Sequence, residues 1–176
     1  SYMRDVASLN WYISEAHIAR AYYYAELIKM YGGVPIIEKT IEQSDNKKAT
    51  QATYDQVVEY IIKEIDTYKG DLAVNWNDFT DRKGRFTLGV ALAIKSRVLL
   101  YAASPLHNPN GDVNKWIKAA EAARDLINNE ELDYALDTNY STYFFGATSL
   151  SSAETIYAVR RSASNTMEVN NYPIST

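Results

Sequence analysis

Cysteine is absent from this chain of 176 residues. Its absence excludes disulfide bonds, zinc sites built from thiolates and catalytic thiols. Histidine occurs only as His17 and His107, and no carboxylate or nucleophile is spaced to match either one. The motifs Gly-x-Ser-x-Gly and His-Glu-x-x-His and the phosphate-binding loop are also missing. The sequence thus offers no catalytic site, and we expect neither an enzyme nor a cofactor.

Long apolar runs and clusters of positive charge are missing as well. No stretch approaches the roughly 20 consecutive apolar residues of a membrane-spanning helix. The formal net charge is -4, and the basic residues are scattered among carboxylates rather than gathered in a stripe, so nucleic acid is not an expected partner. Hydrophobic residues make up 47% of the chain, which is enough to build one domain over residues 1–176.

One pattern occurs twice. Ala-x-x-x-Arg-x-x-x-Tyr-Ala begins at Ala16 and again, without a gap, at Ala93. A period of four places these residues in one row along a helix, so both copies indicate helices whose small Ala16 and Ala93 admit a partner closely. We expect Arg20 and Arg97 to bind helix-end carbonyls or a carboxylate rather than a ligand. The alternative is that the two copies are alike only because helical proteins share a composition.

Each copy is followed by a second helical pattern, which opens on Tyr54 in the first unit and on Trp116 in the second. With Thr53 as an N-cap, the periodicity predicts helix pairs at about 9–69 and 87–129. The individual helices are expected at residues 9–31, 54–68, 87–103 and 115–129. Paired helices that repeat in this way are typical of tetratricopeptide-type arrays, because neither pair buries its apolar face alone. The expected fold class is therefore all-α with tetratricopeptide-like helical repeats.

The rest of the chain is expected to be irregular. Residues 130–176 are rich in Tyr, Ser, Thr and Asn, although residues 154–160 alternate as in a strand or an extended run. The loops at 75–81 and 108–112 carry several Asn and Asp oxygens. Neither has the full spacing and terminal bidentate Glu of a calcium loop, so we assign both to turns and expect no metal.

Segments spread over nearly all of the chain carry a resemblance to a known family. Arg20-Ala-Tyr-Tyr-Tyr24 followed by Tyr31-Gly-Gly-Val-Pro35 strongly resembles the SusD/RagB family of glycan-binding outer-membrane lipoproteins. Further segments follow in the order that this family shows: Thr53-Tyr54 to Asp66, Gly84-Arg-Phe-Thr87, Tyr101-Ala-Ala-Ser-Pro105, Trp116 with Ala119 and Ala123, Glu154-Thr-Ile-Tyr157 and Asn170-Asn-Tyr-Pro173. Family members are several times longer, with a lipidated cysteine at the start and a large loop-rich half at the end. We therefore interpret this chain as a fragment that carries the repeats.

The resemblance implies a noncatalytic carbohydrate-binding component of an outer-membrane nutrient uptake system. Such a protein captures oligosaccharide or polysaccharide for a SusC-like TonB-dependent transporter, and in full length it is lipid-anchored and exposed at the cell surface. Its helices pack on the transporter, while glycan contacts come mainly from irregular loops. The alternative function is a tetratricopeptide-like scaffold that binds protein and no glycan.

Sugar recognition needs flat aromatic rings and planar amide or guanidinium groups. Loop residues with these groups are the candidate carbohydrate-binding residues: Trp76, Arg161, Asn165, Asn170, Asn171 and Tyr172. The competing interpretation is that Trp76 caps the helix core and that the asparagines make turns. Because most of the family's binding loops lie outside these residues, we expect this chain alone to bind glycans poorly.

Overall fold

The computed structural model describes residues 6–40, 49–76, 84–145 and 152–159. These residues form helices and no strand, which confirms the expected all-α class. The elements are α1 (Val6–Tyr31), α2 (Tyr54–Tyr68), the 3-10 helix η1 (Lys69–Asp71), α3 (Leu88–Ala103), α4 (Val113–Ile127) and α5 (Tyr140–Phe145). Within the described ranges, no helix combines the length and the apolar character needed to cross a membrane.

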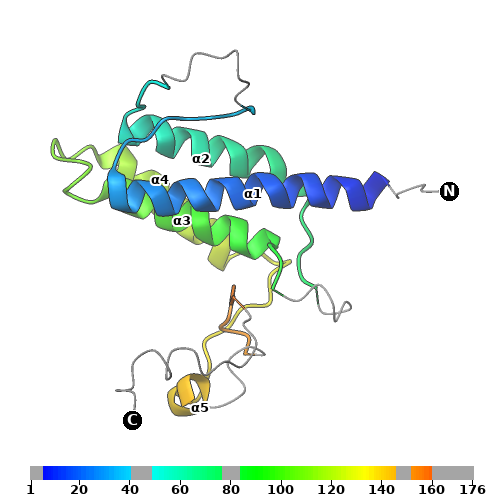
Figure 1. Ribbon diagram of the computed structural model, residues 1–176. Coiled ribbons are helices and arrows are strands. Elements are labelled where there is room, and N and C mark those ends of the chain that lie inside the picture. Colours follow the sequence, from blue (N-terminus) through cyan, green and yellow to red (C-terminus); the bar gives the residue numbers. More distant parts are fainter. Residues whose placement is uncertain (1–5, 41–48, 77–83, 146–151, 160–176) are drawn as a thin grey trace, which may run out of the picture.

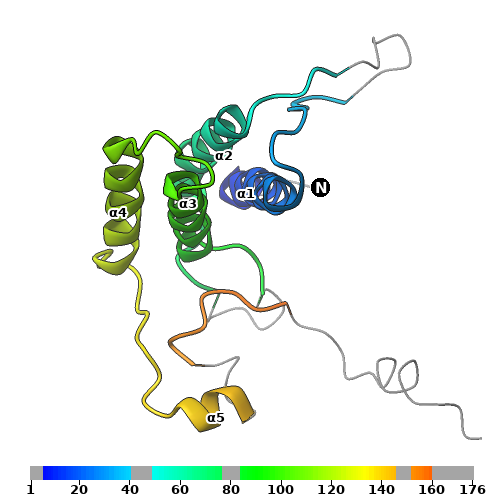
Figure 2. The same cartoon turned by 90° about the vertical axis from the view of Figure 1, so that its left-hand side faces the viewer.

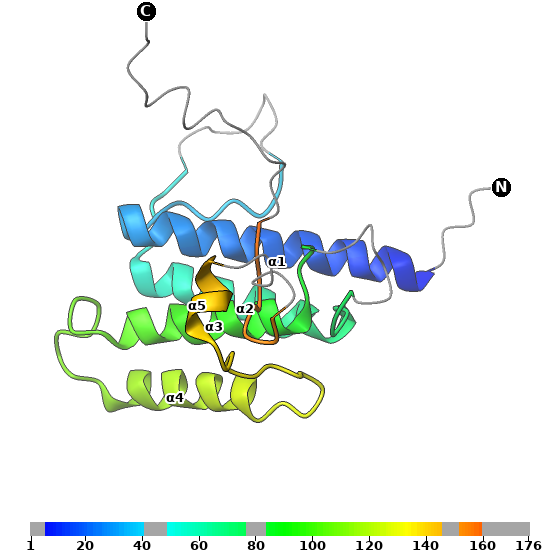
Figure 3. The same cartoon turned by 90° about the horizontal axis from the view of Figure 1, so that it is seen from below.

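The four long helices form two antiparallel pairs, α1 with α2 and α3 with α4 (Figure 1). Seen end on, α3 lies between α1 and α4, and α2 packs over both α1 and α3 (Figure 2). The view from below shows α5 and residues 152–159 across the side of the layer that α2 does not cover (Figure 3). Stacked helix pairs of this kind are the tetratricopeptide-like arrangement that the sequence repeat predicts.

The residues expected to begin α2 and to end α1 do so in the structure. Thr53 and Gln56 form a reciprocal capping box, in which each side chain accepts the backbone N–H of the other, at 3.2 and 2.8 Å. α1 ends where Gly32 adopts a φ of 68° and donates its N–H to the carbonyl of Ile28 at 3.1 Å. Glycine is favoured there because other residues rarely adopt a positive φ.

Gly33 has a different role, which is close approach between two segments. A Cβ atom at this position would lie 2.1 Å from the carbonyl oxygen of Ala52. The N–H of Ala52 donates to the carbonyl of Val34 at 3.3 Å, and the Gln51 side chain donates to the carbonyl of Gly33 at 2.6 Å. The extended segment after α1 is therefore held against the residues that precede α2.

The core lies where α1, α2 and α3 meet. Its most buried members are aliphatic residues from all three helices: Ile18, Ala21, Val57, Ile61, Ile65 and Ala91. Small residues do pack where the helices meet, but at other positions than expected: Ala16 is exposed while Ala21 and Ala25 are buried, and Ala93 lines a cavity beside α1. On α4, Ala119 and Ala122 are the buried residues.

Two further expectations need correction. α4 begins at Val113, two residues earlier than predicted, because the Asp112 side chain accepts the N–H of Asn114 at 2.9 Å and caps the helix. The stretch rich in Tyr, Ser and Thr contains the short helix α5, which its composition did not indicate. Residues 154–159, expected to form a strand or an extended run, are an irregular and partly buried segment, so the strand is not present there.

Candidate carbohydrate-binding groove

A half-open cavity of about 340 Å³ lies between α1 and α3 and is flanked by residues 154–157 and by Tyr143 of α5. We call it the tyrosine groove. Its floor is apolar and consists of Ala25, Ile28, Val90, Ala93, Ile94 and Val98. Tyrosines line it from five segments: Tyr22, Tyr54, Tyr101, Tyr143 and Tyr157. An apolar floor with several aromatic rings and a few polar groups is the usual composition of a small-molecule site.

The chain's own residues 154–157 form one wall of the groove. The ring of Tyr157 stacks on Phe86 with centroids 5.3 Å apart and an interplanar angle of 11°, and its centroid lies 6.4 Å from that of Tyr22. Burial raises the pKa of the Tyr157 phenol, and the nearby tyrosines raise it further. The hydroxyl groups of Thr155 and Tyr143 lie 3.2 Å apart, which joins this wall to α5.

Glu154 is fixed at the start of the same wall. Its Oε2 atom accepts the backbone N–H of Asp137 at 2.8 Å, and the Ser152 hydroxyl donates to the Asp137 carboxylate at 2.7 Å. Hydrogen bonds from the Asn139 backbone and from Ser152 lower the pKa of Asp137. This turn therefore positions the Glu154 carboxylate beside the groove without a cationic partner, so far as the described residues show.

Arg97 brings the complementary charge from α3. It is exposed, lines the groove and has no ion pair with any described residue. On the opposite wall, Lys29 is bound to Glu26 at 2.5 Å. One turn beyond Arg97, Tyr101 is 43% exposed, so its ring is accessible at the groove. The groove thus presents a guanidinium with no ion pair to a described residue, an accessible phenol ring and a carboxylate.

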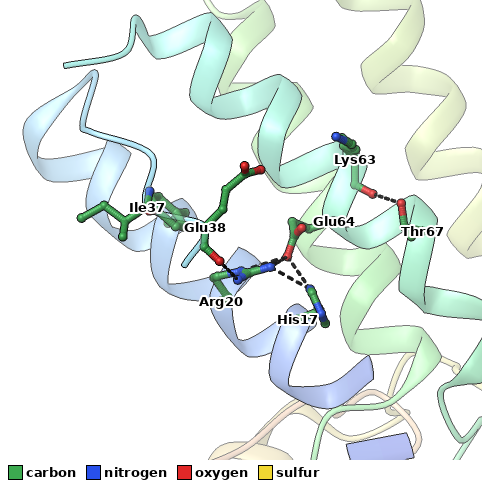
Figure 4. A network of polar contacts seen from close by, with 8 residues as sticks. His17, Arg20, Ile37, Glu38, Lys63, Glu64 and Thr67 are labelled. Carbon is green, nitrogen blue, oxygen red and sulfur yellow. Dashed lines mark hydrogen bonds and ion pairs between the residues drawn. The ribbon is translucent and has the colours of Figure 1, made fainter. Parts of the chain in front are cut away.

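A second polar cluster joins α1 to α2 (Figure 4). Arg20 donates from Nε and Nη2 to Oε2 of Glu64 at 3.0 and 2.6 Å, and its Nη1 atom reaches the carbonyl of Glu38 at 3.5 Å. His17 Nδ1 lies 2.8 Å from the same carboxylate oxygen, and its ring stacks on Tyr68 at 3.5 Å. Burial alone would lower the pKa of Arg20, but the hydrogen bond and charge of Glu64 outweigh it and raise that pKa.

The two arginines of the repeat therefore have different roles. The expectation of helix-end carbonyls or a carboxylate as partner is confirmed at Arg20, which binds the Glu64 carboxylate and also reaches the carbonyl of Glu38. At Arg97 no such partner is found among the described residues, and the row of Ala93, Arg97 and Tyr101 lines the groove. The repeated motif did identify this row in the sequence. The role of this row in the groove was missed because an arginine is paired only where a neighbouring helix supplies a carboxylate. Sequence spacing does not reveal which helix is the neighbour.

Of the candidate carbohydrate-binding residues, Trp76 lies within the described ranges. It is not among the residues that line the groove. Its side chain is only 5% exposed, and its indole N–H donates to the carbonyl of Phe86 at 3.3 Å. Trp11 meets it edge-on at 5.6 Å, and the Arg85 guanidinium lies 5.2 Å from its ring centroid. This placement favours the competing interpretation that Trp76 caps the core. The other candidates, Arg161, Asn165, Asn170, Asn171 and Tyr172, lie outside the described residues.

The loop between α3 and α4 makes a turn, as its composition indicated. Asn108 is buried, donates its amide to the carbonyl of Asp112 at 2.9 Å and accepts the N–H of Asp112 at 2.8 Å. His107 belongs to this loop, and its ring stacks on that of Tyr54 with centroids 3.6 Å apart. Burial lowers the pKa of the imidazole. No group of three metal-binding side chains is found in the parts of the chain that the structure describes.

The stacked pairs and the aromatic groove define a tetratricopeptide-like helical-repeat protein. A SusD-like family model, described as "Starch-binding associating with outer membrane", matches residues 5–100. This match covers more than half of the 176 residues. The chain belongs to the SusD-like family.

Individual relatives agree with this assignment. A SusD-like protein from Formosa agariphila is 25% identical in a 132-residue alignment that covers 70% of this chain and 25% of that protein. A SusD-like protein from Bacteroides fragilis shares the fold with a TM-score of 0.74 at 22% identity, over 92% of this chain and 29% of its own. A laminarin-binding SusD-like protein has a TM-score of 0.69 at 25% identity, over 83% of this chain and 30% of its own. The chain thus spans between a quarter and a third of these relatives.

Proposed function

We propose that this chain is part of a noncatalytic, carbohydrate-binding component of a SusC/SusD-like outer-membrane uptake system. The protein captures oligosaccharides at the cell surface and passes them to a TonB-dependent transporter. The observation that carries this proposal is the SusD-like match over residues 5–100. The likeness to a laminarin-binding SusD-like protein over 83% of the chain adds support for a glycan ligand.

The tyrosine groove supports glycan binding over protein binding. Helical-repeat scaffolds bind peptides in an open groove formed by stacked repeats. Here the groove between α1 and α3 is already covered along one side by residues 154–157, with Tyr157 stacked on Phe86. What remains is a small cavity with aromatic rings, a guanidinium and a carboxylate, which suits a sugar ring better than a polypeptide segment.

The polar groups of the groove also support a role without catalysis. Glycoside hydrolysis needs two carboxyl groups that face one another across the scissile bond, one of them acting as an acid. Of the two carboxylates in the groove, Glu26 is bound by Lys29, and Glu154 accepts a backbone hydrogen bond at the edge. The buried Glu64 holds Arg20 and His17 between α1 and α2. None of these arrangements provides an acid and a nucleophile at one site.

The uptake role is tested in the source bacterium. An antibody raised against this chain is used to follow the protein during membrane fractionation and to precipitate it from detergent-solubilised outer membranes. We expect recovery in the outer-membrane fraction, together with a TonB-dependent transporter identified by mass spectrometry. Recovery in the cytosolic fraction, or precipitation from outer membranes without any transporter of that class, would contradict the proposal.

A further inference from the structure

We propose that the tyrosine groove is a subsite for one neutral hexopyranose residue of an oligosaccharide, held by Arg97, Tyr101 and Glu154. This inference rests on the proposed function, because it names the class of sugar and the residues that bind it. Both Arg97 and Glu154 line the cavity, and Tyr101 is accessible at 43% exposure.

The size of the cavity indicates a single ring. Its volume of about 340 Å³ is near the lower end of the roughly 300–1,000 Å³ that small-molecule sites span. The neighbouring units of an oligosaccharide would then lie outside the cavity. Residues 154–157 bound the cavity along one side.

The walls of the cavity suit the two kinds of surface that a pyranose presents. The apolar floor includes the small side chain of Ala93, one turn from Arg97, and it can receive the C–H face of a sugar. Tyrosine rings combine a flat apolar face with a polar tip, so they stack on that face and reach hydroxyl groups at its edge. Tyr101 and Tyr157 bring such rings from α3 and from the chain's own wall.

The charges in the groove favour a neutral ligand. Four charged residues line it, and their formal charges cancel: Glu26, Lys29, Arg97 and Glu154. Glu26 and Lys29 bind one another, which leaves Arg97 and Glu154. A guanidinium only donates hydrogen bonds and a carboxylate only accepts them, whereas a sugar hydroxyl does both. Neighbouring hydroxyls of a neutral sugar can therefore satisfy both groups, while a uronate would bring its negative charge close to Glu154.

The experiment is an NMR titration of the 176-residue chain, followed by amide chemical shifts. The probes are laminarihexaose and maltohexaose as neutral ligands and an oligogalacturonate of equal length as the acidic ligand. We expect saturable shifts with millimolar affinity for at least one neutral probe, centred on residues 94–101 and 154–157. Millimolar affinity is expected because a single subsite offers few contacts.

Two variants test the named residues, and each has a matched control. Arg97→Ala and Tyr101→Ala are expected to weaken binding of the neutral probe at least five-fold. The same changes at exposed positions outside the groove, Arg124→Ala and Tyr31→Ala, are expected to leave the affinity unchanged. Circular dichroism checks that all four variants retain the helical content of the parent chain.

Each other outcome decides against the subsite. Shifts confined to the surroundings of Trp76 or to residues 160–176 would overturn it while leaving a glycan-binding function intact. Tighter binding of the oligogalacturonate than of both neutral probes would refute the assigned sugar class. The absence of shifts with all three probes at 20 mM would also refute the subsite, whereas the proposed uptake function is decided separately by fractionation and by the accompanying transporter.

Discussion

Replacement of Arg20 by alanine should be among the more damaging single changes in the helices. Arg20 donates two hydrogen bonds to Oε2 of Glu64, whose side chain is only 10% exposed. Loss of the arginine would leave a buried carboxylate with His17 as its remaining partner. Breaking a buried pair in this way typically costs about 3–5 kcal/mol. Because the Arg20 side chain is 30% exposed, water can replace part of the interaction, and we expect a loss of about 2–3 kcal/mol.

The repeat supplies a matched control for this change. Arg97 occupies the equivalent position in α3 but is exposed and has no ion pair among the described residues. Arg97→Ala should therefore change the free energy of unfolding by no more than about 0.5 kcal/mol. The double variant Arg20→Met, Glu64→Gln should cost less than Arg20→Ala, because it leaves no unpaired buried charge.

Urea denaturation followed by far-ultraviolet circular dichroism measures these differences, with the free energy obtained by linear extrapolation. The reasoning would be refuted if Arg20→Ala and Arg97→Ala cost the same. It would also be refuted if the double variant were as unstable as Arg20→Ala, since the cost could then not arise from the carboxylate left behind.

Three further predictions use the same assay. Gly33→Ala should destabilise the protein by about 1–3 kcal/mol, because the added Cβ would lie 2.1 Å from the carbonyl oxygen of Ala52. The control is Gly70→Ala, whose Cβ would have no atom within 4 Å and which should be neutral or slightly stabilising. Equal effects of the two changes would contradict this. Tyr60→Phe should not destabilise the protein, because its buried hydroxyl has no hydrogen-bond partner among the described residues; a clear loss would show that a partner exists. Although burial opposes it, hydrogen bonds from Lys69 and Lys95 lower the pKa of Asp66, so its contribution is present at neutral pH and is lost as the pH falls below about 4. Asp66→Asn should therefore flatten the fall in stability with acid, and an unchanged fall would refute this.

The helices could be predicted closely because their signals are local. Thr53 forms the capping box that its sequence context indicates, and α1 ends at the expected residue because Gly32 takes a positive φ. The start of α4 was misplaced because Asp112 was assigned to a turn, and a capping side chain looks the same in sequence as a turn residue.

The groove could not be predicted because it depends on contacts between distant segments. Residues 154–157 meet α1 and α3 from more than fifty positions away in the sequence, and Phe86 provides the ring on which Tyr157 stacks. Arg97 resembles Arg20 in its local sequence, yet among the described residues Arg20 has a carboxylate partner and Arg97 has none. For Trp76, the aromatic type and loop position suggested sugar binding, while burial of its side chain follows from packing against Trp11 and Arg85.

The central claim is that the protein binds glycans without cleaving them. It is tested most directly by affinity electrophoresis of the native protein, isolated from outer membranes of the source bacterium, in gels that contain laminarin, starch or pectin. Each polysaccharide is also incubated with the protein and assayed for new reducing ends. The account predicts retarded migration with at least one neutral polysaccharide and no release of reducing ends. Unretarded migration in every gel, or steady production of reducing ends, would contradict it.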